Sequence, residues 1–157
     1  MKTRILILLL LLISSTAISQ TILTALTSPG SWDDGPSAGV GIENQEGLLY
    51  YGAEAYAFPQ LNGIDYAHAI GRIGLNIKLD HWGRFKIIGG VRVGLIYRGE
   101  HLNYALIGAE TGIQVEIFDN LYGIITASRD SRSDSKYYSS QDSITVNSVW
   151  VKIGIKL

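Results

Sequence analysis

The chain has 157 residues, no cysteine, and 13 Lys plus Arg against 14 Asp plus Glu. Without cysteine it can form neither a disulfide framework nor a thiolate metal site. The balanced charge lacks the basic footprint of a nucleic-acid-binding protein, so we expect no nucleic-acid partner.

Residues 1–19 predict a secretory signal peptide. Lys2 and Arg4 precede nine consecutive apolar residues, and Ala17 and Ser19 have the spacing that a signal peptidase cleaves. The apolar run is shorter than the roughly 20 residues of a membrane helix, and an uncleaved anchor is the alternative interpretation. We therefore expect one exported domain over residues 20–157.

The rest of the chain predicts β-strands. Seven segments alternate apolar and polar residues, which is the period of a strand and not of a helix: 37–44, 48–58, 65–79, 85–99, 107–118, 121–130 and 148–157. No apolar run after residue 19 approaches the length of a membrane helix, so a membrane location would require a closed barrel. Because bacterial single-chain barrels have even strand numbers, we expect residues 21–28 to form the eighth strand, although they alternate poorly.

Short and long connections alternate between these segments. The short turns are expected at 44–47, 79–83 and 118–120, and the longer polar loops at 29–36, 58–65, 98–103 and 130–143. This asymmetry is typical of an outer-membrane barrel, with short periplasmic turns at one end and longer extracellular loops at the other.

The polar face of the strands combines charges with glycines. In segment 107–118, Ile107, Ile113 and Val115 share one face, whereas Glu110 and Glu116 share the other with three small or amide residues. Glycine weakens a solvent-exposed strand without benefit. In a narrow eight-stranded lumen, however, it leaves space for large charged neighbours.

We therefore interpret the polar face as the lumen and its charges as a structural network of ion pairs. Its expected members carry both signs: Glu43, Glu54, Arg72, Arg92, Glu110, Glu116 and Lys152. Buried charges are accommodated when they are paired and hydrogen-bonded. The alternative is a solvated sheet face with incidental charges.

Aromatic residues near the strand ends are expected to form two interfacial belts. One belt lies beside the long loops and the other beside the short turns: Phe58, Tyr66, Tyr97 and Tyr104 against Trp82, Phe85, Phe118 and Tyr122, with Tyr50 and Tyr51 near the second.

The pattern over residues 21–157 resembles the small eight-stranded outer-membrane barrels of the OmpA and OmpX type. The resemblance implies an all-β, eight-stranded, antiparallel up-and-down transmembrane β-barrel in the cell outer membrane. Its implied partners are outer-membrane lipid and the barrel-assembly machinery, and we expect a monomer. Such barrels usually end in an aromatic residue, whereas this chain ends with Leu157.

No residue pattern predicts catalysis, a cofactor or a metal. His68, His81 and His101 could serve a site, but no HxS spacing accompanies them. The loop at 130–143 contains Asp130, Asp134 and Asp142 but lacks the spaced ligands and central glycine of a calcium loop. Tyr137 and Tyr138 in this loop are a candidate contact surface for an unidentified extracellular ligand.

Three functions are compatible with the sequence. The first is an integral outer-membrane barrel with a plugged lumen and a structural or surface-interaction role, not an open pore and not an enzyme. The second is a secreted or periplasmic soluble β-barrel that binds a small apolar ligand. The third is a lipid-modifying outer-membrane enzyme, of the lipid A-modifying kind that some similar barrels represent.

Overall fold

The computed structural model describes residues 20–28, 37–61, 64–99, 101–134 and 144–157, without the side chains of 58–61, 64–65 and 101–103. The predicted signal peptide, Tyr137 and Tyr138 lie outside the described residues, as do the side chains of Phe58 and His101. Among the described residues, no helix has the length and apolar character needed to cross a membrane.

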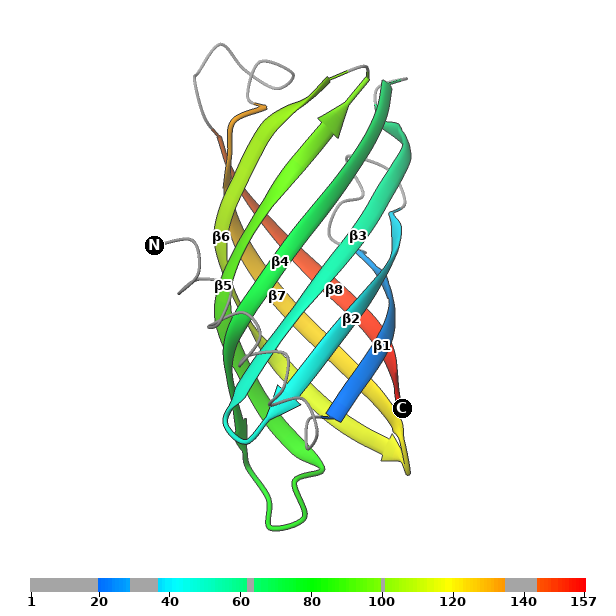
Figure 1. Ribbon diagram of the computed structural model, residues 1–157, viewed down its shortest axis with the longest axis vertical. Helices are drawn as coiled ribbons and strands as arrows, with labels where there is room; N and C mark the ends of the chain where they lie inside the picture. Colours follow the sequence, from blue (N-terminus) through cyan, green and yellow to red (C-terminus); the bar gives the residue numbers. More distant parts are fainter. Residues whose placement is uncertain (1–19, 29–36, 62–63, 100, 135–143) are drawn as a thin grey trace, which may run out of the picture.

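Eight antiparallel strands form one closed barrel (Figure 1). They are β1 (Gln20–Thr27), β2 (Ala38–Glu46), β3 (Leu49–Leu61), β4 (Ile64–Lys78), β5 (Phe85–Arg98), β6 (His101–Phe118), β7 (Leu121–Arg132) and β8 (Ile144–Lys156). Each strand pairs with its sequence neighbours, and β1 pairs with β8 to close the sheet. The all-β, eight-stranded antiparallel barrel is therefore confirmed. This includes the strand at 21–28, which was expected because such barrels have an even number of strands.

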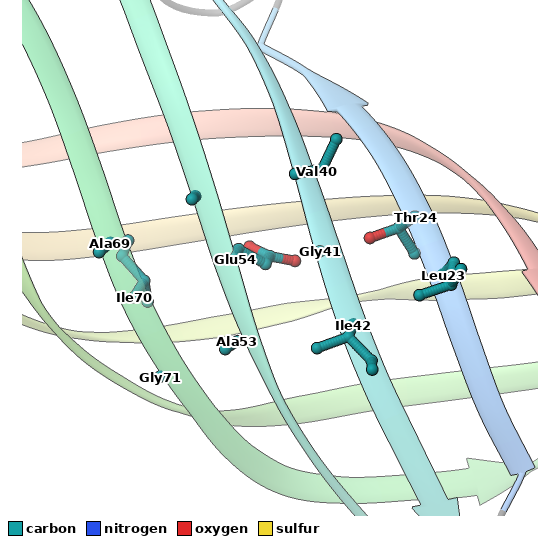
Figure 2. A pocket seen from close by; sticks show the side chains of 11 residues that line it. Leu23, Thr24, Val40, Gly41, Ile42, Ala53, Glu54, Ala69, Ile70 and Gly71 are labelled. Atoms are coloured by element: carbon teal, nitrogen blue, oxygen red, sulfur yellow. The ribbon is translucent and has the colours of Figure 1, made fainter.

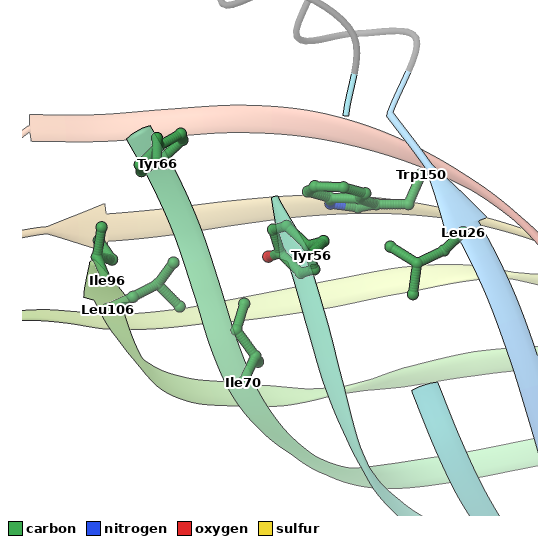
Figure 3. Close-up of a cluster of buried hydrophobic side chains, with 7 residues drawn as sticks. All are labelled: Leu26, Tyr56, Tyr66, Ile70, Ile96, Leu106 and Trp150. Atoms are coloured by element: carbon green, nitrogen blue, oxygen red, sulfur yellow. The ribbon is translucent and has the colours of Figure 1, made fainter. Parts of the chain in front are cut away.

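The alternation of residues sorts side chains between the barrel interior and its outer wall. The outer wall carries many exposed large apolar residues, such as Val93 (63% exposed) and Ile107 (67%). The interior holds two separate apolar clusters. The first contains Leu26, Tyr56, Tyr66, Ile70, Ile96, Leu106 and Trp150 (Figure 3), and the second contains Ile22, Tyr50, Ile88, Tyr122 and Ile124.

Two connections that were expected to be long loops consist largely of strand. β3 continues to Leu61 before β4 begins at Ile64, and β5 reaches Arg98 before β6 begins at His101. Gly99 has a positive φ of 58°, which suits a tight turn. The sequence did not indicate these extensions, because the polar residues at the strand ends resemble those of a loop. The two longest connections, 28–37 and 133–143, do lie at this end of the barrel, which we call the loop end.

The expectation of aromatic belts is wrong for three of its members. Tyr66 and Tyr122 are 2% and 3% exposed and belong to the interior clusters, and Tyr104 packs against the first cluster. All three occupy positions on the inward-facing side of the residue alternation. This alternation decides the orientation of a side chain more strongly than its closeness to a turn. Trp82, Phe85 and Phe118 are exposed at the opposite end, the turn end, and Tyr97 is partly exposed.

Candidate functional site

The barrel interior is the candidate functional site, because the charged side chains gather there. Among the described residues, six cations and five carboxylates are buried: Arg72, Lys86, Arg92, Arg98, Arg132 and Lys152 against Glu43, Glu54, Glu110, Asp130 and Asp134. The two signs nearly balance, so the interior can hold these charges as pairs.

The order of inward residues along single strands places one group of charges between the two apolar clusters. On β5, the inward residues from the loop end are Arg98, Ile96, Gly94, Arg92, Gly90, Ile88 and Lys86. On β3, Glu54 and Gly52 separate Tyr56 of the first cluster from Tyr50 of the second. A charged layer therefore lies between two apolar layers, and further buried charges such as Arg98 and Lys86 lie beyond those layers toward the two ends of the barrel.

Arg72 is the centre of the charged layer. Its Nη1 donates to Oε1 of Glu54 at 2.5 Å and to Oε2 of Glu43 at 3.1 Å, and its Nε donates to Oε1 of Glu110 at 2.6 Å. Nζ of Lys152 also donates to Glu54. Two cations thus face three carboxylates, and we call these five residues the central network. Tyr50 closes the turn-end side by donating to Oε1 of Glu110 at 2.8 Å.

Strand register places a glycine opposite four of these five side chains, whereas Lys152 lies opposite Leu26 and Ile124. Gly52 lies between Glu43 on β2 and Arg72 on β4, whereas Gly41 faces Glu54 and Gly90 faces Glu110. A Cβ on Gly41 would stand 2.6 Å from Oγ1 of Thr24 and 3.0 Å from Cγ of Glu54. The inward glycines therefore provide the volume that the charged side chains occupy.

Amide side chains extend the central network toward the turn end. Nζ of Lys86 donates to Oε1 of Gln45 at 2.6 Å, and Nε2 of Gln45 donates to Glu43 and to Gln114, each at 2.6 Å. Glu116 is only partly buried and accepts a long hydrogen bond of 3.4 Å from Tyr122. The structure thus separates Glu116 from the central network with which the sequence grouped it.

Arg92 lies opposite Arg72 on the neighbouring strand, but its side chain contacts residues nearer the loop end and not the carboxylates of the central network. It donates to the Tyr56 hydroxyl at 2.8 Å, its Nε lies 3.6 Å from Oδ1 of Asp130, and its guanidinium stands 5.8 Å from the Trp150 ring centroid. Through these contacts, Arg92 of the charged layer packs directly against Tyr56 and Trp150 of the first apolar cluster.

A second charge group lies at the loop end and was not predicted. Arg98 donates to Oδ2 of Asp134 at 2.8 Å, and Arg132 donates to the same carboxylate at 2.7 and 3.0 Å. The Arg98 guanidinium also stacks 4.0 Å from the Tyr66 ring centroid. We call Arg98, Arg132 and Asp134 the loop-end group.

The sequence signal for the loop-end group was weak. Residues from 130 onward read as a polar loop because both strand faces are polar there, with Arg129 and Ser131 outward and Asp130 and Arg132 inward. Every second residue from Tyr122 and Ile124 onward points inward, and continuing this alternation could have identified Asp130 and Arg132 as lumen residues. The expectation that the strand ends at Asp130 and that residues 131–132 belong to a loop is wrong, since β7 extends to Arg132.

His68 and His81, the two histidines whose side chains the structure describes, lie toward opposite ends of the barrel. His68 is buried, with Nε2 within hydrogen-bond distance of the Tyr66 hydroxyl and its ring 4.8 Å from that of Tyr56. His81 lies in the turn beside Trp82, and His101 begins β6. The described residues contain no group of three or more His, Cys, Asp or Glu side chains that could hold a metal ion.

Grooves on the outer wall are lined by apolar side chains. One, of about 680 Å³, lies over β1 to β4 (Figure 2). Its outward residues are small on β3 and β4, including Ala53, Ala55 and Ala69, and larger on β1 and β2, including Leu23 and Ile42.

The fold is similar to those of known membrane barrels. Neisserial surface protein A has a TM-score of 0.55 and 11% sequence identity, over 88% of this chain and 96% of that chain. A de novo designed transmembrane β-barrel has a TM-score of 0.54 and 13% identity, over 88% and 95% of the two chains. The chain matches no protein-family model and no curated protein. At these identities the likeness shows the eight-stranded barrel fold.

Proposed function

We propose that the chain is an integral barrel of the Gram-negative outer membrane, of the small OmpA and OmpX type, with a plugged lumen. Its role is structural or surface-interacting. The proposal includes neither solute conduction nor catalysis. Outer-membrane lipid and the barrel-assembly machinery are its proposed partners, and the monomer is its proposed state.

The observation that carries this proposal is the inversion of polarity across the barrel wall. Among the described residues, the buried side chains include 12 hydrophobic and 20 polar or charged residues, whereas the large exposed residues of the strands are mainly Leu, Ile and Val. A soluble barrel would place its apolar face inside. An outer wall of this kind is suited to contact with lipid chains.

The filled lumen supports a role other than diffusion. An eight-stranded barrel has an interior just wide enough for side chains. Here Arg72 with its carboxylate partners, Tyr50, and the pair Tyr56 and Trp150 occupy that interior at successive levels. The same polar filling argues against the soluble alternative, which requires an apolar interior for an apolar ligand.

The loop end is the proposed interaction surface. The two longest connections lie there, and exposed loops on a rigid scaffold commonly carry binding functions. An unidentified extracellular ligand is the proposed partner of this end, and Tyr137 and Tyr138 belong to one of its connections.

Lysine substitutions on the outer wall test the membrane location. We would express the full chain in a Gram-negative host, separate the membranes, and follow heat-modifiable migration. Val93→Lys and Ile113→Lys place charges on the exposed apolar wall, with an expected cost of about 2–4 kcal/mol near the bilayer centre. The expected result is recovery of the unsubstituted protein in the outer membrane and loss of both variants from it.

Thr145→Lys is the matched control, because Thr145 is exposed near the loop end of β8. It should insert normally, since charges near the interface cost only about 0–1 kcal/mol. Recovery of the unsubstituted chain and both wall variants as folded soluble protein would contradict the proposal.

A further inference from the structure

The outer wall contains one polar interruption, centred on Arg129 of β7. Among the described strand side chains, Arg129 is the only charge that faces outward between the two ends of the wall, since Glu46 adjoins the turn at 47–48. Arg129 lies three residues before the end of β7, toward the loop end. In a membrane barrel, this places it toward the outer leaflet.

Strand register surrounds Arg129 with small and polar residues. Its cross-strand neighbours are Ala109 on β6 and Asn147 on β8, and the next pair toward the turn end is Ala127 with Val149. The side chains of Arg129 and Asn147 make no hydrogen bond or ion pair with any residue that the structure describes. Two adjacent polar groups therefore face outward with their hydrogen-bonding capacity unused.

An apolar groove adjoins these two polar groups. It has a volume of about 440 Å³ and includes Ala109, Thr111, Ala127 and Val149 beside Arg129 and Asn147. Thr111 adds little polarity, because its hydroxyl already donates to the Ile88 carbonyl. The groove over β1 to β4 is different, since its outward side chains carry no charge. Of these two grooves, the one at Arg129 combines an apolar floor with a positively charged residue at its edge.

We propose that the groove on β6 to β8 binds an anionic phosphorylated lipid, with an acyl chain along Ala127 and Val149 and the phosphate at Arg129 and Asn147. This inference rests on the proposed membrane function. A guanidinium is suited to phosphate because it offers several N–H donors in a planar fork. The amide of Asn147 supplies a second donor at the same level.

The chemistry of the wall disfavours a second copy of the chain as the occupant. Arg129 would then need a carboxylate at the same level of the partner's outer wall. Among the described strand side chains, no outward carboxylate lies near the loop end, and Glu46 is at the turn end. A lipid phosphate supplies the missing negative charge at the membrane surface.

Lipid retention by the purified full-length barrel tests this proposal. Wild-type protein in detergent is titrated with phosphatidylglycerol or phosphatidylcholine, and bound lipid is counted by native mass spectrometry. The wild type should retain phosphatidylglycerol more tightly, and Arg129→Gln should weaken that retention about fivefold, since one basic residue near a membrane surface contributes on this scale. Arg129→Lys should keep most of the preference, because the positive charge remains.

Arg84→Gln is the matched control, because Arg84 is exposed in the turn at 79–84 and the substitution removes the same charge. It should leave the lipid preference unchanged, and all variants should show the same heat-modifiable migration. Equal retention of the two lipids by wild type, or an unchanged preference in Arg129→Gln, would overturn the lipid site alone. Failure of the wild type to insert into vesicles of the same lipids would overturn the proposed membrane function as well.

Discussion

Gly108 on β6 lies directly opposite Asp130 on β7, so that a Cβ at Gly108 would overlap Oδ1 of Asp130. The same Cβ would stand 2.5 Å from the Arg129 carbonyl oxygen and 2.9 Å from Cα of Asp130. Rotation of the Asp130 side chain alone cannot relieve the contacts with the backbone. Gly108 is also the cross-strand neighbour of Arg92, so this glycine provides space on both sides.

Gly108→Ala is therefore expected to destabilise the barrel by about 1–3 kcal/mol, the usual cost of overpacking a filled interior. The measurement is urea unfolding in a defined detergent or lipid system, followed by tryptophan fluorescence. Gly71→Ala is the control, because its Cβ would point outward and meet no atom closer than 3.7 Å. Equal unfolding midpoints for the two variants would contradict the conclusion that the inward glycine provides space for neighbouring side chains.

Much of the fold followed from residue alternation, and glycine position indicated which face is inside. Gly90, Gly108 and Gly112 share their face with Glu110 and Arg92, and that face is the lumen. Alternation specifies which residues of a strand share a face, so it identifies the residues that point into the lumen. It does not specify which charges meet across the lumen, because this depends on register and tilt around the closed sheet.

The errors of the sequence interpretation arise where closeness to a turn or residue composition was used in place of strand alternation and pairing. Tyr66 and Tyr122 were assigned by their closeness to turns, although parity directed both rings inward. Arg132 was assigned to a loop because polar residues occupy both faces near the loop end. Where a barrel wall extends beyond its apolar band, composition no longer separates strand from loop, and only pairing with the neighbouring strand does.

Removal of the Arg72 guanidinium should destabilise the barrel strongly. Arg72→Met leaves Glu43 and Glu110 buried without their guanidinium partner, and breaking a buried ion pair from one side costs about 3–5 kcal/mol. The free energy of unfolding in urea measures the effect. Arg84→Met, at an exposed turn position, should change it by no more than about 0.5 kcal/mol.

Adding Glu110→Gln to Arg72→Met should restore part of the lost stability, because it removes one uncompensated charge. A double-mutant cycle separates this coupling from the effects of the single substitutions. Additive effects of the two changes would show that Arg72 and Glu110 are not energetically paired. Heat-modifiable migration verifies that each variant forms a barrel before its stability is compared.

The layered filling of the lumen predicts an absence of steady ion conductance. Trp150→Ala removes the ring that packs 4.4 Å from Tyr56, centroid to centroid, but leaves Arg72 and Tyr50 across the lumen nearer the turn end. We therefore expect neither wild type nor Trp150→Ala to form open channels in planar lipid bilayers. A wider porin measured in parallel verifies incorporation. Stable channels from the wild type would contradict the plugged lumen, whereas channels from Trp150→Ala alone would place the seal at the first apolar cluster.

The turn at 79–84 is expected to respond to acid through Asp80. Oδ1 of Asp80 accepts a hydrogen bond of 2.8 Å from the Phe85 amide, and this bond lowers the pKa of the carboxyl in the folded protein. Because the folded pKa is lowered, the stabilisation is present above the ordinary carboxyl range and is lost as pH falls through the lowered value. The Phe85 amide proton, followed by NMR, should therefore titrate with a midpoint below the ordinary aspartate value of about 3.9.

Asp80→Asn is the control for that titration, because it keeps an oxygen acceptor but cannot ionise. The Phe85 amide shift should then be independent of pH across the acid range, whereas Asp80→Ala should shift this resonance even at neutral pH. A wild-type midpoint at or above the ordinary value would contradict the role of the Phe85 amide. Since Asp80 lies outside the strands, acid should loosen this turn without unfolding the sheet, and far-UV circular dichroism should keep its β-sheet spectrum throughout the same titration.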